Sequence, residues 1–129
     1  MRRPPGAGSR GSATLEFALV LPLVLLMTLA LVQVGVLVKD QLVVVESARA
    51  GAREASVSDD DAARQAAVGA ATSLDAARLD VAVERQGGAG APVSVAVTYH
   101  APIAIPIVAW LFPSTIDLST TAIMRQETE

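Results

Sequence analysis

Apolar residues run without a charged side chain from Phe17 to Val38. As a helix, this stretch is about 33 Å long at 1.5 Å per residue, enough to cross the roughly 30 Å hydrocarbon core of a bilayer. A cleavable secretory signal has a shorter apolar region, about 7–15 residues, followed by a small-x-small cleavage site. The pattern therefore predicts one transmembrane helix.

The helical pattern continues beyond Lys39, because the following stretch contains no proline. Small residues recur there at the spacing of one helix face, namely at Ala48, Gly51, Ala52 and Ala55. Such a strip allows another backbone to approach closely. An interface with the rest of the chain's own domain is favoured over a seam between molecules.

A second, shorter helix is predicted from Ser58 to about Ser73. Ser58 is the expected N-cap, and three aspartates at 59–61 follow it, where the helix dipole favours acidic groups. A calcium loop needs spaced ligands and a turn glycine, which this triplet lacks. We interpret it as a solvated helix start.

Three later segments alternate in the manner of β-strands. Their apolar sets begin at Leu79, Val93 and Ile116, and the last set continues through Leu118, Thr120, Ala122 and Met124. The glycine-rich sequence GGAGA joins the first two segments as a flexible hairpin connection. Together the elements predict an α+β fold, in which a long amino-terminal helix continues into a domain with a short helix and about three antiparallel strands.

Prolines interrupt the apolar stretch between the second and third strands, at Pro102, Pro106 and Pro113. They exclude a regular helix or central strand across the whole stretch. We expect a buried loop that covers the sheet. The alternative is a helical turn at 107–112, or a dip of these residues into the lipid interface with Trp110.

Composition agrees with a membrane protein, since 52% of the residues are hydrophobic and 18% are charged. Basic residues flank both ends of the apolar run in nearly equal strength, so their count alone does not decide which end of the helix lies in the cytoplasm. No basic stripe interleaved with aromatic residues occurs, and nucleic acid is not an expected partner. Cysteine is absent, which excludes a disulfide framework and a thiolate metal site.

Few residues offer chemistry. His100 is the only histidine, so a Ser/His/Asp arrangement would have to be assembled around it. Metal ligation by His100 would need Asp117 or Glu84, and no spacing favours either. We expect no enzyme activity, no metal and no cofactor, and we interpret His100 as a surface or half-buried side chain at a strand end.

Glu16 is the one carboxylate at the start of the apolar run, and Gly11 precedes it by five residues. A carboxylate at headgroup level can reach water at modest cost, which explains its tolerance there but not the glycine. The basic leader, Gly11, Ser12, Glu16 and Phe17 resemble a type IV prepilin processing site, in which cleavage follows the glycine.

The longer pattern resembles the TadE-like proteins, minor pilins or pseudopilins of tight-adherence (Flp pilus) assembly systems. Matching positions open the helix at Gly11, Glu16, Phe17, Ala18 and Pro22. A second element matches at Ala48, Arg49, Gly51, Ala52 and Arg53. The chain departs from the pattern at 33–35, where many members carry an aromatic or acidic residue and this chain has Gln-Val-Gly.

The resemblance implies a leader at 1–11, a transmembrane helix at 12–38 and an extracytoplasmic domain at 39–129. It also implies cleavage between Gly11 and Ser12 by a prepilin peptidase, with the amino terminus in the cytoplasm. Other pilins or pseudopilins, membrane platform proteins and the lipid bilayer are the implied partners. Pro22 is the site of a possible helix kink. An uncleaved, membrane-anchored binding module is the alternative function, and an anchored hydrolase is a third.

Overall fold

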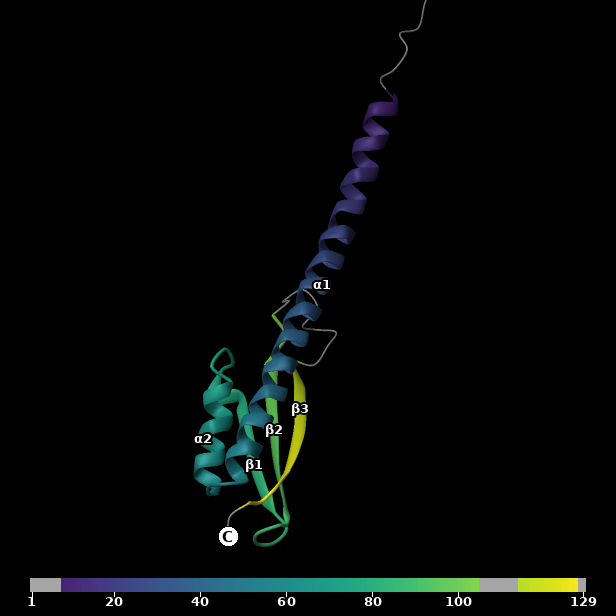
Figure 1. The fold of residues 1–129 in the computed structure, drawn as a ribbon. Coiled ribbons are helices and arrows are strands. Elements are labelled where there is room, and N and C mark those ends of the chain that lie inside the picture. Colours follow the sequence, from purple (N-terminus) through teal and green to yellow (C-terminus); the bar gives the residue numbers. More distant parts are fainter. Residues whose placement is uncertain (1–7, 105–113, 128–129) are drawn as a thin grey trace, which may run out of the picture.

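The computed structural model describes residues 8–104 and 114–127. The elements follow in the order α1 (Gly8–Ala55), α2 (Asp60–Ala70), η1 (Ala76–Arg78), β1 (Leu79–Arg85), β2 (Pro92–Pro102) and β3 (Thr115–Arg125). The predicted α+β fold is confirmed: a long helix is followed by a short helix and a three-stranded antiparallel sheet (Figure 1).

Helix α1 contains 48 residues and continues without a break from the apolar run into the folded domain. Its amino-terminal half projects away from the other elements, and its carboxyl-terminal half lies along the sheet (Figure 1). Large apolar side chains in the projecting half are exposed, as at Leu19 and Leu31. By length and composition, α1 can cross a membrane, where lipid would cover these side chains.

The sheet has the strand order β1-β2-β3, with both neighbouring pairs antiparallel. Val97 at the centre of β2 lies opposite Val81 on β1 and Thr120 on β3. Burial alternates along all three strands, so one face of the sheet is turned inward. This agrees with the period-two pattern of the sequence.

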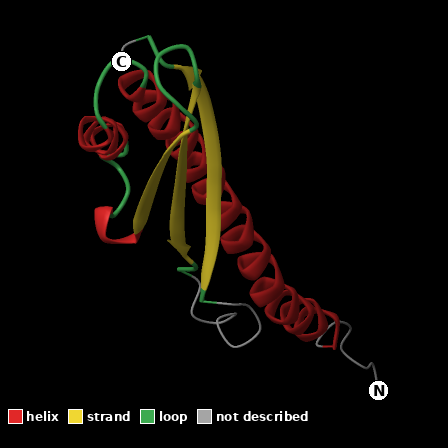
Figure 2. Cartoon of the chain, turned by 90° about the horizontal axis from the view of Figure 1, so that it is seen from below, coloured by secondary structure: helices red, strands yellow, loops and turns green. Residues whose placement is uncertain are grey.

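Both helices lie on the inward face of the sheet. Helix α1 contacts β2 and β3, while α2 contacts α1 and β1; Figure 2 shows α1 running along the sheet. Small and β-branched side chains fill the core between these layers: Val44, Ala48, Ala52, Ala55, Ala63, Ala67, Val93, Val95, Val97, Tyr99 and Ala101. Because these side chains are small, the helices and the sheet pack with their backbones close together, and the core needs few aromatic side chains.

The second helix differs from its prediction at both ends. Asp59, not Ser58, is its N-cap, because the Asp59 carboxylate accepts a hydrogen bond from the Ala62 amide at 2.8 Å. The Ser58 hydroxyl instead donates to Oε1 of Glu54 on α1, at 2.6 Å. The helix ends at Ala70 rather than near Ser73, and tight turns follow it. Thr72 and Ser73 favour helix only weakly.

The proline-rich connection between β2 and β3 falls largely outside the described residues. Pro102 forms the last position of β2, opposite Thr115. The buried loop expected between the strands, and its alternative at 107–112, lie in the part of the chain that the structure does not describe.

Candidate functional site

The first predicted site lies at the amino-terminal end of α1. Gly11, Ser12, Glu16 and Phe17 are all exposed on this helix. Apart from its chain neighbours and the backbone of its own helix, no described atom lies within 4 Å of a Cβ built at Gly11. The Ser12 hydroxyl donates a hydrogen bond to Oε1 of Glu16 at 3.2 Å, across one helical turn. These residues therefore form one accessible patch at the start of the apolar helix.

The helix is already formed at Gly8, inside the expected leader. The first four amides of an α-helix have no partner within the helix, and glycine is a poor helix former. Opening the chain around the Gly11–Ser12 bond therefore breaks only the bonds of the first turn. The residues of the patch are therefore helical, but the first turn of the helix can unwind at a low cost in free energy.

Pro22 lies inside α1, which continues through it. Its ring nitrogen cannot donate the usual bond to the carbonyl of Ala18, which favours a bend. The Thr28 hydroxyl donates to the Val24 carbonyl at 2.9 Å, so this polar group is paired inside the apolar run. A kink at Pro22 stays a prediction.

The strip of small residues lies between α1, α2 and the sheet. Ala48, Ala52 and Ala55 are fully buried. A Cβ built at Gly51 would lie 3.0 Å from both the Ala67 Cβ and the Val95 Cγ1. The close approach that the sequence indicates occurs here within one chain.

The two arginines of the same sequence element are turned away from the core. Arg49 and Arg53 line a groove of about 390 Å³ between α1 and β3. Arg49 makes a surface ion pair with Glu46 on its own helix, at 3.3 Å. The element thus divides into small residues that pack and arginines that lie on the surface.

A match to a known protein family covers both of these sequence elements, the one that begins at Gly11 and the one that ends at Arg53. Residues 11–53 match the family of TadE-like proteins. This stretch is TadE-like. It starts at Gly11, contains Glu16, Pro22 and the small residues up to Ala52, and ends at Arg53, so the resemblance drawn from the sequence is confirmed there. No curated protein and no solved structure matches the chain.

The TadE-like segment therefore comprises most of α1, and the elements that pack against it lie outside the match. Two polar groupings occur in those elements. Neither was recognised from the sequence.

Arg85 is the centre of the first grouping, at the end of the domain farthest along α1 from the apolar run. Its Nε donates to Oδ1 of Asp60 at 2.6 Å and its Nη2 to the Ser58 carbonyl at 2.7 Å. Its Nη1 donates to Oε1 of Gln126 at 2.9 Å and to the Ala55 carbonyl at 3.0 Å. One guanidinium thus joins α1, the start of α2, β1 and the chain after β3.

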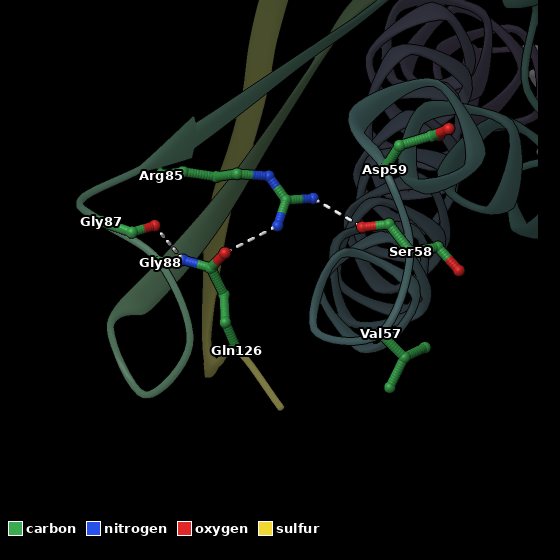
Figure 3. A pocket seen from close by; sticks show the side chains of 7 residues that line it. All are labelled: Val57, Ser58, Asp59, Arg85, Gly87, Gly88 and Gln126. Atoms are coloured by element: carbon green, nitrogen blue, oxygen red, sulfur yellow. Dashed lines mark hydrogen bonds between the residues drawn. The ribbon is translucent and has the colours of Figure 1, made fainter. Parts of the chain in front are cut away.

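Figure 3 shows Arg85 reaching across a hollow of about 530 Å³ toward Ser58 and Gln126. Gln126 in turn donates to the Gly87 carbonyl at 2.9 Å, in the hairpin between β1 and β2. Because the chain itself supplies acceptors to the Nε and both Nη atoms, this arrangement is suited to holding the elements together rather than to binding an anion. A sequence signal existed: Arg85 occupies an inward position in the alternation of Leu79, Val81 and Val83.

The three aspartates at the start of α2 have separate structural partners. Asp59 caps the helix, Asp60 pairs with Arg85, and Asp61 pairs with Arg64 at 3.0 Å. Across the described ranges, no group of three His, Cys, Asp or Glu side chains has the arrangement to hold a metal ion.

The second grouping surrounds His100 on the outward face of the sheet. Its Nδ1 lies 2.6 Å from Oδ1 of Asp117, and its Nε2 lies 3.0 Å from Oδ2 of Asp80. From the sequence, Asp117 was named only as a ligand that a metal site at His100 would need, whereas Asp80 was missed. Glu84, the other residue considered, lies opposite Ser94 in the register. The His100 side chain is 41% exposed, as expected for a half-buried position.

Proposed function

We propose that this chain is a minor pilin or pseudopilin of a tight-adherence (Flp-type) pilus assembly system. The observation that carries the proposal is the Gly11–Glu16 spacing, which lies at the exposed start of an apolar helix and inside the TadE-like match. The protein supports pilus assembly, surface adhesion or secretion as a structural component, without catalytic activity.

A prepilin peptidase cuts the chain between Gly11 and Ser12. The exposure of both residues supports access to this bond, and the open space around Gly11 leaves room for a protease subsite. Since proteases bind their substrates in extended form, the first turn of α1 unwinds before cleavage. Gly11 lowers the cost of that step.

Cleavage creates a positively charged amino group on Ser12, one helical turn from Glu16. The 3.2 Å contact between the Ser12 hydroxyl and Glu16 supports this pairing, because the new amine belongs to the same residue. The amine pairs with Glu16 of its own chain or of a neighbour. In a low-dielectric assembly, each charge offsets the desolvation of the other.

Helix α1 anchors the protein in the cytoplasmic membrane, with the leader in the cytoplasm and the domain of α2 and the sheet on the extracytoplasmic side. The apolar length of α1 supports the anchor. The TadE-like match supports the partners: the peptidase, other pilins or pseudopilins, and the membrane platform proteins of the system.

The test is co-expression of the full chain with its cognate prepilin peptidase, followed by intact mass spectrometry. We expect a mature chain that begins at Ser12. Gly11→Leu should block processing. Gly35→Leu is the matched control, since a Cβ at Gly35 also meets no atom within 4 Å on the same helix, and it should be processed normally.

A wild-type chain that keeps residues 1–11 in the presence of active peptidase would refute the processing step. It would favour an uncleaved membrane-anchored binding module. Equal processing of Gly11→Leu and Gly35→Leu would show that the peptidase does not require a glycine at position 11.

A further inference from the structure

His100 lies on the central strand, with a carboxylate on each side. Asp117 is its direct partner across the β2–β3 register, and Asp80 on β1 lies one diagonal step away, opposite Thr98. Each ring nitrogen faces a different carboxylate: Nδ1 faces Asp117 at 2.6 Å and Nε2 faces Asp80 at 3.0 Å. One imidazole therefore connects all three strands.

The protonation state of the ring decides whether both contacts can exist. A neutral imidazole has one N–H donor and one bare nitrogen, whereas the imidazolium has two donors. Ionised carboxylates only accept hydrogen bonds. A neutral His100 can therefore bond one aspartate, while its bare nitrogen repels the other. With both carboxylates ionised, only the imidazolium can donate to both of them.

Among the described residues, the charged groups in contact with His100 are the two aspartates. Its outward neighbours on β2 are Thr98 and Pro102, and both helices pack on the opposite face of the sheet. The hydrogen bond to Asp117, and after it the one to Asp80, raises the pKa of His100 above its ordinary value, while partial desolvation opposes this. The two hydrogen bonds that connect His100 to Asp117 and Asp80 therefore also favour the protonated ring.

The cluster lies at the end of the sheet from which the β2–β3 connection departs. Just beyond it, the Ile103 amide donates to the Ser114 carbonyl at 3.2 Å, closing the base of that connection. The next amide, of Ala104, donates to Oε1 of Gln33 on α1 at 3.2 Å. Gln33 lies within the apolar run, so this end of the sheet is the one nearest the proposed membrane anchor.

We propose that His100 is a proton-controlled clamp for the membrane-proximal end of the sheet. Beside the backbone ladder, the imidazolium adds one side-chain bond from β2 to β1 and one to β3, and loss of its proton breaks one of these two bonds. The contact with Asp117 is the shorter, so the neutral ring keeps its proton on Nδ1 and releases Asp80. Rising pH therefore loosens the start of β1, while the β2–β3 pair stays closed.

The aspartates allow the clamp to be tested apart from the fold. In Asp80→Asn, the side-chain amide can donate to the bare Nε2 of neutral His100. This variant should keep β1 attached at both low and high pH. In Asp117→Asn, the carboxylate with the closest contact is lost, and the pKa of His100 should fall. Asp75→Asn serves as the control, because Asp75 pairs with Arg78 and caps η1 through the Ala77 amide rather than bonding to His100, and asparagine is also a good cap.

The experiment uses the isotope-labelled full chain in detergent micelles, studied by NMR at about pH 5.5 and about pH 8.5, on either side of the ordinary histidine pKa of about 6.5. We expect His100 to titrate above 6.5. After correction for intrinsic base catalysis, amide exchange at the start of β1 should rise severalfold at the higher pH. His100→Gln and Asp80→Asn should both abolish this rise, and Asp75→Asn should retain it.

Two results would overturn the clamp. One is titration of His100 at or below its ordinary pKa. The other is the same pH-dependent exchange in β1 in the wild type and in Asp80→Asn. Asp80→Asn replaces an exposed side chain with one of the same shape, so this arm remains informative even if His100→Gln fails to fold.

Discussion

Gly51 on α1 lies directly against Val95 on the central strand, and a Cβ built on the glycine would approach Cγ1 of Val95 to 3.0 Å. The same Cβ would lie 3.0 Å from the Cβ of Ala67 and 3.2 Å from the Ala63 carbonyl oxygen. Helix α1 therefore packs against both α2 and the sheet at Gly51, where a methyl group would require its neighbours to shift. The glycine is required here for space rather than for backbone conformation, since Gly51 has an ordinary helical backbone.

Gly51→Ala should destabilise the folded domain. Overpacking of a core costs about 1–3 kcal/mol, and alanine recovers about 0.5–1 kcal/mol of helix propensity, so we expect a net loss of about 1 kcal/mol, within limits of about 0 and 2.5 kcal/mol. Urea unfolding of the full chain in micelles, followed by circular dichroism, measures it. Gly69→Ala on α2 is the control, because its Cβ meets nothing within 4 Å; equal losses in both variants would contradict the packing argument.

Arg85→Met should loosen the end of the domain that lies farthest along α1 from the apolar run. The substitution keeps the aliphatic stem and removes four hydrogen bonds. Bonds that involve a charged group contribute about 1.5–3 kcal/mol each, but not additively, so we expect a loss of about 2–3 kcal/mol in unfolding free energy. Arg78→Met breaks only a surface pair with Asp75 and should cost less than about 1 kcal/mol. Similar costs for the two variants would argue against a central role for Arg85.

Asp59→Ala should weaken the start of α2, because the N-cap carboxylate is lost. Loss of such a cap costs about 1 kcal/mol. The specific readout is hydrogen exchange of the Ala62 amide, the group that Asp59 caps. Ser58→Ala, which removes a contact to Glu54 instead, should leave that amide protected. Faster exchange in Ser58→Ala than in Asp59→Ala would restore Ser58 as the cap.

Local pattern was enough to predict the elements. The uncharged run and the small-residue strip indicated one continuous helix, and the alternation around Val95 and Leu118 indicated strands with one inward face. These signals depend only on near neighbours along the chain. The choice between Ser58 and Asp59 as N-cap was not predictable in this way, because it depends on Ser58 finding a partner on another helix.

The two polar groupings were hidden for a related reason. Asp80, His100 and Asp117 are far apart in sequence and meet only through the strand register. An isolated outward-facing histidine carries no sign of that pairing. Arg85 was more accessible to sequence reasoning, since a charged residue at an inward strand position requires a buried partner. Its acceptors, however, come from four different parts of the fold.

Glu16→Gln should permit membrane insertion and peptidase processing but impair incorporation into a pilus. The proposed assembly pairs this carboxylate with the new amine of Ser12, and an amide cannot supply the opposite charge. A charge-assisted bond contributes about 1.5–3 kcal/mol, and each 1.4 kcal/mol corresponds to a factor of ten. Incorporation should therefore fall by about tenfold or more, as measured by the amount of the protein in sheared pilus fractions relative to membranes.

Ser12→Ala separates the amine from the hydroxyl in this last test. It removes the 3.2 Å hydrogen bond between the Ser12 hydroxyl and Glu16 but leaves the mature chain with the same α-amino group. If the amine is the true partner, Ser12→Ala should assemble like the wild type while Glu16→Gln does not. Impairment of both variants to the same degree would assign the role to the hydroxyl contact already present before cleavage. Normal assembly of Glu16→Gln would reduce Glu16 to a carboxylate that the membrane surface tolerates.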